Sequence, residues 1–351
     1  MASFNIACNL SAGQSMENLE MRFDMRIGIV DSGINCGAVK SVVHQWDFTN
    51  QNGTVSSADQ NGHGTMSAKV LEEFSDTAIE FISAKIFGDR LAADIKTLIR
   101  ALDFLETCDL DLLHMSISID EDILNRDIKR ICRNMLDHGT RIVTAFSNKM
   151  HKTAMAQMKG VITVQGQNFE NSACYWFSDR TGKAIADKVP LLVSYDRNRY
   201  RFYNGNSKAA SILTSHLINC FNHEKKEFQM DFFKRGALKN DWVETDERLL
   251  DCRLQPKIDT WKDIAYDLRR MIEVILMEIL QVHDQILLKE HSWIGYPFGI
   301  NGMKAFEIIH RIENECKIKF DMKNIFLSYF LDYQSFGYLL KSNLALRDRL
   351  V

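Results

Sequence analysis

Three short motifs, far apart in the chain, place an aspartate, a histidine and a serine where each could take part in catalysis. Asp31 ends the apolar run in IVDSG, His63 lies between two glycines in NGHGT, and Ser207 precedes small apolar residues in NGNSKAA. A hydroxyl, an imidazole and a carboxylate can serve as nucleophile, general base and orienting group in acyl transfer. The chain order Asp, His, Ser is one of the known orders for this arrangement.

Each motif also has an ordinary structural interpretation. Asp-Ser-Gly is a common sequence where a strand passes into a turn, and Ser207 could cap the amino end of a helix. His63 could be structural, with its flanking glycines allowing another backbone to approach closely. The presence of all three motifs in that order favours the catalytic interpretation.

The elements that would position these residues alternate between strands and helices. We expect strands at 26–30, 79–85, 112–118, 141–145 and 161–164 and helices at 66–74, 94–106 and 123–138. This alternation predicts an α/β fold with a doubly wound parallel sheet. Asp31 would then lie at the carboxyl end of the first strand, where open sheets of this kind bind ligands.

The composition is that of a globular protein, with 46% apolar and 25% charged residues. Its 43 Lys and Arg against 46 Asp and Glu give a net charge of −3, and neither sign forms a long block, which argues against nucleic-acid binding. The eight cysteines form no Cys-x-x-Cys pair, so we expect free thiols in a reducing compartment and no zinc site. No calcium site has a recognisable spacing.

The sequence also lacks features of export and of membrane insertion. The first 26 residues have no basic start, and acidic residues interrupt their apolar ones, unlike a secretion signal. Residues 271–288 are strongly apolar, but charged residues at helical spacing are typical of a packed amphipathic helix. We therefore expect a cytoplasmic protein without membrane contact, in which residues 1–25 form an N-terminal extension.

Residues 26 to about 220 resemble the catalytic domain of the subtilisin-like serine peptidases. Besides the three motifs, the similarity rests on ISAKI at 82–86, LLHMS at 112–116, VTAFSN at 143–148 and KGVITVQG at 159–166. The resemblance implies that Ser207 is the nucleophile, that His63 accepts its proton and that Asp31 orients the imidazole. It also implies that Asn148 and the backbone N–H of Ser207 bind the oxyanion. The chain would then be a serine endopeptidase acting on a peptide or protein.

Several positions depart from the family pattern. The family's Thr before the nucleophile is Asn206, whose amide can still donate a hydrogen bond. Where glycines usually open the substrate pocket, the chain has Ile-Ser-Ile at 117–119. These side chains predict a narrow, selective pocket and limited processing rather than general degradation. The residues that we expect to line it are Ser116, Ile117, Ser118 and Ser147.

After about residue 235 the pattern changes to helices alone. We expect a connector at 221–259 and a helical domain at 260–351, of which residues 260–342 resemble acyl or peptidyl carrier domains. Its motif GINGM at 299–303 matches the carrier pattern, except that Gly302 replaces the serine that carries phosphopantetheine. The resemblance implies a four-helix domain without a prosthetic group, which could still bind a biosynthetic partner protein. A generic helical bundle is the alternative.

Together these features predict a cytoplasmic subtilisin-like serine endopeptidase that needs neither a folding propeptide nor a cofactor. Its task would be limited processing, for example removal of the leader from a ribosomally made peptide. Two alternatives stay open. One is a catalytically inactive protein that uses the fold to bind peptides, and the other is a carrier-docking scaffold whose helical domain does the main work.

Overall fold

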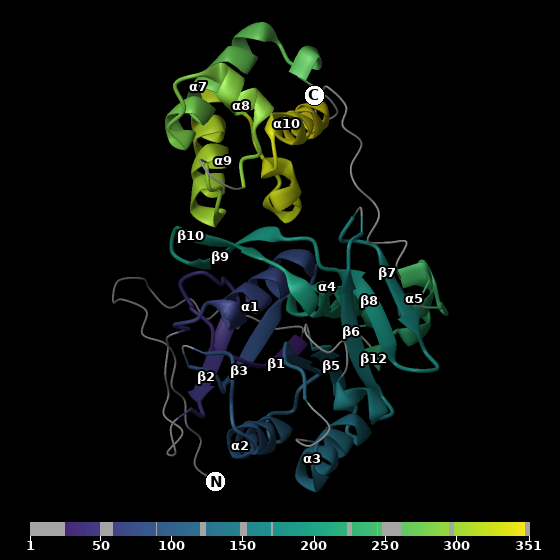
Figure 1. Cartoon of the computed structure of the whole chain (residues 1–351). Coiled ribbons are helices and arrows are strands. Elements are labelled where there is room, and N and C mark those ends of the chain that lie inside the picture. Colours follow the sequence, from purple (N-terminus) through teal and green to yellow (C-terminus); the bar gives the residue numbers. More distant parts are fainter. Residues whose placement is uncertain are drawn as a thin grey trace, which may run out of the picture.

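The computed structural model describes residues 25–49, 59–88, 90–119, 124–147, 153–169, 171–222, 227–243, 245–247, 261–294 and 298–347. Figure 1 shows a layered α/β unit, coloured purple to teal, and above it a group of helices in green and yellow. Elements that precede residue 248 build the α/β unit, and elements within 261–347 build the helical unit.

The α/β unit contains a sheet of eight strands in the order β2-β3-β1-β4-β5-β6-β8-β7. Every neighbouring pair is parallel except β7 and β8. Most strand residues are buried, as expected where helices cover both faces of a parallel sheet. The strands are β1 (Met25–Asp31), β2 (Val42–Asp47), β3 (Ile79–Lys85), β4 (Leu112–Met115), β5 (Arg141–Ala145), β6 (Val161–Gln167), β7 (Tyr175–Ser178) and β8 (Lys183–Asp187).

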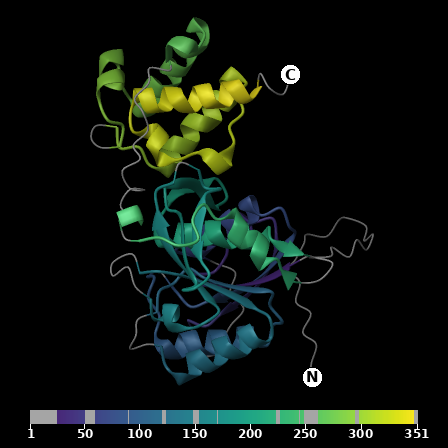
Figure 2. The same ribbon diagram turned by 90° about the vertical axis from the view of Figure 1, so that its right-hand side faces the viewer.

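Helices cover both faces of the sheet (Figures 1 and 2). One face carries α1 (His63–Phe74) and α4 (Gly205–Ile218), and the other carries α2 (Ile95–Glu106) and α3 (Arg126–Asp137). The mixed α/β fold with a largely parallel sheet is therefore confirmed.

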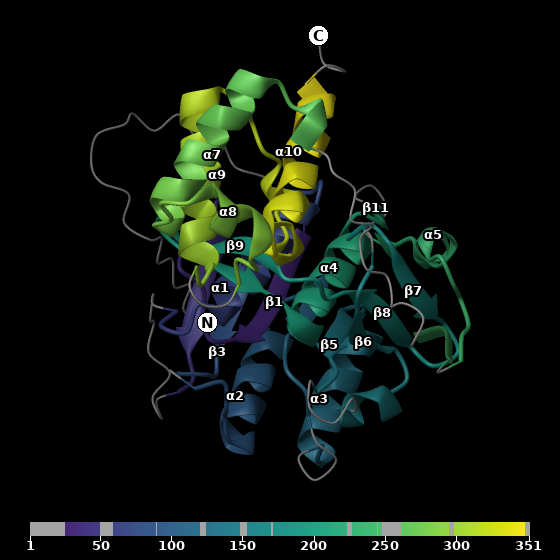
Figure 3. The same cartoon turned by 45° about the horizontal axis from the view of Figure 1, so that its top comes forward.

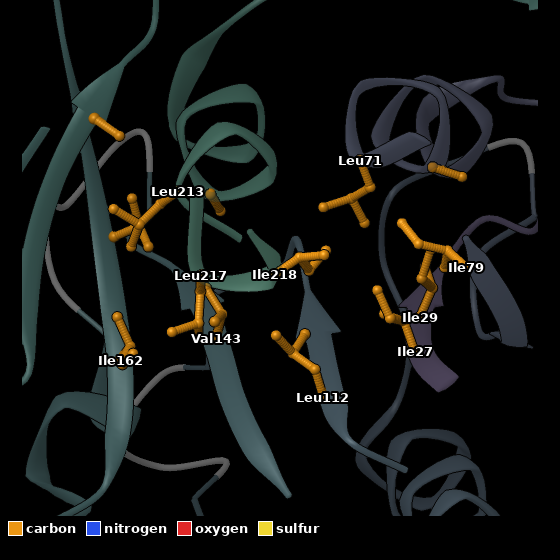
Figure 4. Packing of buried hydrophobic residues seen from close by; sticks show 14 of the residues in the cluster. Ile27, Ile29, Leu71, Ile79, Leu112, Val143, Ile162, Leu213, Leu217 and Ile218 are labelled. Carbon is orange, nitrogen blue, oxygen red and sulfur yellow. The ribbon is translucent and has the colours of Figure 1, made fainter. Parts of the chain in front are cut away.

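The two faces have separate hydrophobic cores because successive side chains of a strand point to opposite sides. Ile27 and Ile29 of β1 belong to the core under α1 and α4, whereas Val30 belongs to the core under α2 and α3. Figure 4 shows the first of these cores, where Leu71 of α1 and Leu217 of α4 face the strands. The strands are therefore continuously apolar because their side chains are buried in the cores on both faces of the sheet.

All the strands and helices expected between residues 26 and 164 are present, with small shifts at their ends. α3 begins at Arg126 rather than at 123 because Asn125 caps it, its side chain accepting a hydrogen bond from the Ile128 N–H. Sequence reasoning missed β2, whose sequence VVHQWD mixes polar and apolar residues, and the antiparallel pair β7 and β8 at the sheet edge.

The strand order reverses beside β1. From β1 the chain forms β2 and β3 on one side and then crosses to β4 on the other. In open α/β sheets, ligands bind at such a point, outside the carboxyl ends of the strands. Asp31 is the last residue of β1 and Ser116 directly follows β4, so both lie at this switch point.

The predicted connector at 221–259 is folded where the structure describes it. β11 (Phe221–Asn222) pairs with β12 (Glu227–Phe228), and α5 (Met230–Gly236) follows. Phe233 of α5 is fully buried in the same core as α4, and the Tyr175 hydroxyl donates a hydrogen bond to its carbonyl at 2.6 Å. The α/β unit therefore extends past the expected boundary at 220. Residues 248–260 lie outside the described residues.

The helical unit has a core of its own, in which Trp293 and Phe336 are fully buried. α9 begins at Gly302, within the carrier-like motif at 299–303. The elements are η2 (Trp261–Asp263), α7 (Tyr266–Leu280), α8 (Gln285–Glu290), α9 (Gly302–Cys316), η3 (Met322–Asn324), η4 (Leu327–Phe330) and α10 (Tyr333–Arg347).

A hairpin lies between the two units (Figures 1 and 3). Its antiparallel strands are β9 (Leu191–Asp196) and β10 (Arg199–Tyr203), and β10 is followed almost directly by α4. The Leu192 N–H donates to the Ile325 carbonyl at 2.8 Å, and the Leu327 N–H donates to the Pro190 carbonyl at 2.9 Å. The helical unit is thus hydrogen-bonded to β9 in the manner of a short extra strand.

Candidate active site

Asp31 and His63 form a buried pair at the carboxyl end of β1. Nδ1 of His63, the first residue of α1, lies 2.8 Å from Oδ1 and 2.9 Å from Oδ2 of Asp31. The Asp31 side chain is fully buried, and 14% of the His63 side chain is exposed. The carboxylate therefore orients the ring and favours a proton on Nδ1, which leaves Nε2 able to accept one.

The glycines beside His63 make this contact possible. A Cβ on Gly64 would lie 2.2 Å from the Gly33 carbonyl oxygen and 3.0 Å from the Asp31 Cβ. Gly62 has a φ of 84°, which L side chains disfavour. The expected close approach of another backbone is confirmed, because α1 begins against the turn that follows β1.

Asp59 holds the start of α1, a role that the motifs did not indicate. Its Oδ1 accepts a hydrogen bond from the Gly62 N–H at 2.7 Å, and its Oδ2 accepts one from the Thr65 N–H at 2.9 Å. A carboxylate at the amino end of a helix also interacts favourably with the helix dipole. Asp59 is buried, so it fixes the turn from which His63 projects.

The pKa of His63 is raised above its ordinary value. Burial alone would lower this pKa by disfavouring the imidazolium, but the charge of Asp31 and its hydrogen bond outweigh burial, and Asp59 contributes in the same direction. The surroundings thus stabilise the protonated ring, which is the state of a general base after it has accepted a proton.

Ser207 lies in the first turn of α4. Asn204 occupies the N-cap position, so the alternative interpretation of Ser207 as the helix cap is wrong. Ser207 is buried, and its Oγ donates a hydrogen bond to the Ser116 carbonyl at 3.3 Å. Within the described part of the chain, the Ser207 hydroxyl is hydrogen-bonded to Ser116 and not to His63. The hydroxyl faces the end of β4 and not its own helix.

His63 and Ser207 line the same pocket, whose volume is about 390 Å³. Three of the predicted substrate-binding residues, the run 116–118, also line it. The other residues that line the pocket are mostly apolar: Ile86, Phe87, Leu91, Ala92, Ala93, Asp94, Ile95, Leu98 and Ile119. The structure therefore brings the expected nucleophile, base and substrate segment together at one opening.

Two predicted site residues are not part of this pocket. Ser147 is half-buried just after β5 and does not line it. Asn148, expected to bind the oxyanion, lies outside the described residues.

Asn206 ties the start of α4 to the sheet. Its Oδ1 accepts a hydrogen bond from the Gly166 N–H at 2.7 Å, and its Nδ2 donates to the Phe146 carbonyl at 3.0 Å. The amide thus donates to a backbone carbonyl in this structure, and the two bonds connect the turn before Ser207 to the ends of β5 and β6.

A buried chain of polar side chains runs behind the Asp31–His63 pair. Ser67, one turn after His63 on α1, places its hydroxyl 3.3 Å from Asp31 Oδ2 and 2.7 Å from the Tyr203 hydroxyl. The same hydroxyl lies 3.3 Å from Ser116 Oγ. Asp31 is therefore connected to the end of β4 and to the last residue of β10.

His114 extends this chain to α4. Its Nε2 lies 2.7 Å from Ser116 Oγ, and its Nδ1 lies 3.0 Å from Thr214 Oγ1 of α4. Burial lowers the pKa of His114 to about 4, although the nearby charge of Asp31 opposes this. The ring is therefore neutral near pH 7 and offers one donor and one acceptor. His114 was not singled out from the sequence, although a histidine within an otherwise apolar strand could have indicated it, because a buried imidazole needs hydrogen-bond partners.

Gly302, the position that the carrier resemblance singles out, lies at the junction with the hairpin. It is the first residue of α9 and is buried, and a Cβ there would lie 2.5 Å from the Tyr200 carbonyl oxygen and 2.7 Å from the Arg201 Cα. The chain's own hairpin therefore covers this position, which leaves no space for a prosthetic group or a docked partner at that point.

Neither a membrane-spanning helix nor a metal site is found among the described residues. No helix in the described ranges is long and apolar enough to cross a membrane. Across those same residues, no three His, Cys, Asp or Glu side chains are grouped so that they could hold a metal ion.

Comparisons with known proteins identify similar structures but no sequence relatives. No family model matches the chain, and no curated protein matches it. One similar structure is the epidermin leader peptide processing serine protease of Staphylococcus aureus, with 14% identity and a TM-score of 0.47 over 56% of this chain and 64% of that one. Another is a lanthipeptide protease, with 14% identity and a TM-score of 0.48 over 60% of this chain and 78% of that one. The match to the first therefore spans less than two thirds of that protein's length.

Proposed function

We propose that this chain is a subtilisin-like serine endopeptidase with Asp31, His63 and Ser207 as its catalytic triad. The observation that carries the proposal is that His63, which is hydrogen-bonded to Asp31, lines the same pocket as Ser207. The pocket lies at the switch point of a largely parallel sheet, where such folds bind their ligands. The three side chains come from the end of β1 and from the first turns of two different helices.

In the proposed reaction, Ser207 Oγ attacks the scissile carbonyl carbon and its proton moves to His63 Nε2. Asp31 stabilises the imidazolium through its bonds to Nδ1. The tetrahedral intermediate collapses as the imidazolium gives its proton to the leaving amine. Water then attacks the acyl-enzyme with His63 again as base, which releases the second product and restores the Ser207 hydroxyl.

The proposal requires the Ser207 hydroxyl to turn toward His63. In the structure the hydroxyl donates to the Ser116 carbonyl, and catalytic hydrogen bonds commonly form only when substrate is bound. The Ser207 backbone N–H, at the amino end of α4, would donate to the oxyanion, with Asn148 as the proposed second donor. One such donor contributes about 3 kcal/mol of transition-state stabilisation.

We assign limited processing of a peptide or protein as the task, with leader removal as the proposed setting. The support is the segment 116–119, where Ile117 and Ile119 are buried side chains at positions that the family fills with glycine. They reduce the space beside the scissile bond and restrict which residue can precede it.

Cleavage of a random peptide library, followed by mass spectrometry, tests this function. The full-length protein should cut, whereas Ser207→Ala and His63→Ala should each lose activity almost completely, because members of a triad act as a unit. Equal cleavage by Ser207→Ala would refute the assignment. Peptide binding without cleavage by the unaltered protein would instead indicate a binding protein.

A further inference from the structure

Phe326 belongs by sequence to the helical unit but is buried within the α/β unit. It lies between η3 and η4, is 8% exposed, and joins a hydrophobic cluster with residues of α1, α4 and the hairpin. Its backbone forms an isolated β-bridge with Leu191. The hydrogen bonds of the neighbouring residues Ile325 and Leu327 to the chain at 190–192 hold it there. The ring is therefore held in place by the hairpin.

The Phe326 ring lies near a buried ammonium group beside the proposed nucleophile. Lys208 directly follows Ser207 and is fully buried, and its Nζ lies 5.5 Å from the centroid of the Phe326 ring. The ammonium forms an ion pair with the buried Asp187 and lies 3.4 Å from the Ser172 hydroxyl. A cation is attracted more strongly to an aromatic face when both are desolvated.

Asp187 is itself held at the end of β8. Its Oδ2 accepts a hydrogen bond from the Ser172 hydroxyl at 2.8 Å, and its Oδ1 accepts one from the Val189 N–H at 3.1 Å. Taking two charges out of water is costly, so a buried pair persists only with good geometry and further hydrogen bonds. The Lys208 side chain is thus confined between Asp187 and Phe326.

The cluster around Phe326 also contacts the helix that carries His63. Met66 and Val70 of α1 and Ile212 of α4 belong to it. The cluster that includes the Phe326 ring therefore contains side chains from both helices that bear proposed catalytic residues.

We propose that Phe326 is a positioning residue for Ser207, through which the C-terminal helical unit completes the active site. This inference rests on the proposed function, in which the Ser207 hydroxyl attacks and its N–H binds the oxyanion. Lys208 is one peptide bond from Ser207, so confining its side chain restricts the first turn of α4. A misplacement of about 1 Å at a reacting group can cost about 100-fold in rate.

Inactivation by a fluorophosphonate measures this effect in the full-length protein, because an activated serine oxygen attacks the phosphorus, displaces fluoride and becomes phosphonylated. Phe326→Met keeps an apolar side chain of similar length but removes the aromatic face. The matched control is Phe320→Met, because Phe320 is also 8% exposed and belongs to the helical core without joining the cluster around Phe326. Phe326→Tyr restores the aromatic face.

We expect Phe326→Met to lower the inactivation rate constant kinact about five- to tenfold with KI unchanged, as loss of a desolvated cation–π contact would allow. Phe320→Met should leave kinact unchanged even where it lowers the melting temperature, and Phe326→Tyr should recover most of the rate. Unchanged kinact in Phe326→Met, or an equal loss in Phe320→Met, would overturn the inference. If Phe326→Met does not fold, Phe326→Leu takes its place with the same expectations.

Amide hydrogen exchange tests the inference without relying on catalysis. Phe326→Met should speed exchange in the first turns of α4, residues 207–211, while Phe320→Met should not. An unaltered protein that never reacts at Ser207 would refute the proposed function, yet this exchange difference would still support the positional role. Equal exchange in both variants would refute that role.

Discussion

The backbone of Tyr200 leaves no room for a side chain on Gly302, since a Cβ there would lie 2.5 Å from the Tyr200 carbonyl oxygen. Gly302→Ser should therefore force α9 away from β10 and lower the free energy of unfolding by about 1–3 kcal/mol, as overpacking usually does. Denaturant unfolding measures this loss.

Gly88→Ser is the matched control, because a Cβ at Gly88 would meet no atom within 4 Å. Its stability should change by less than about 0.5 kcal/mol. The Gly302→Ser variant should also stay unmodified by coenzyme A and a broad phosphopantetheinyl transferase. A stable variant that gains the prosthetic group would contradict the packing described here and support the carrier resemblance.

Removing the Tyr203 hydroxyl should weaken the polar chain behind Asp31. Tyr203→Phe loses the 2.7 Å bond to Ser67, so we expect a loss of about 1 kcal/mol in stability and a several-fold fall in kcat. Tyr338→Phe, on the exposed side of α10, should change neither quantity. A normal kcat in Tyr203→Phe would show that the chain supports the fold without affecting catalysis.

The acid limb of the pH profile should report the raised pKa of His63. The base must be neutral to accept a proton, so kcat/KM should fall as pH drops through a pKa above the ordinary 6.5. Asp31→Asn removes the charge that raises this pKa, so the limb should move to lower pH while the rate falls on the order of 10³–10⁴-fold. An unmoved limb in that variant would exclude His63 as the titrating base.

Cleavage should discriminate against bulky aromatic residues before the scissile bond. The buried side chain of Ile117 occupies space beside the pocket, and a misfit there should cost about 1–3 kcal/mol. Ile117→Gly should improve cleavage after Phe about tenfold or more relative to cleavage after Ala, whereas Ser118→Ala, at an exposed position, should not. A strong preference of the unaltered protein for Phe or Tyr would contradict this view of the pocket.

The sequence was sufficient to predict the position of a residue in the fold where the residues next to it in the chain form a recognisable motif. Asp31 and His63 lie in short motifs whose glycines the local backbone requires, and the parallel strands follow from apolar runs that are buried on both faces. Ser207 was placed correctly at the start of a helix, and only the alternative interpretation of it as the helix cap was wrong, because Asn204 occupies that position.

Residues whose partners are distant in the chain could not be predicted in this way. Ser67 and Tyr203 are 136 residues apart, and nothing near either one indicates their hydrogen bond. The contact of Phe326 with Lys208 likewise depends on how the helical unit packs on the hairpin. This contact was not expected, because the sequence was divided into two separate domains. The periodicity of apolar residues shows which face of a helix or strand is buried, but it does not show which other element packs against that face.

Ser207 as an activated nucleophile is tested by treating the full-length protein with a fluorophosphonate, followed by mass spectrometry of the intact chain and of its peptides. We expect one adduct per chain, located on Ser207, that is absent in Ser207→Ala and formed far more slowly in His63→Ala, because both variants remove part of the proton-transfer unit. A folded protein that gains no adduct, or gains it at another serine, would contradict the assignment of Ser207 as an activated nucleophile.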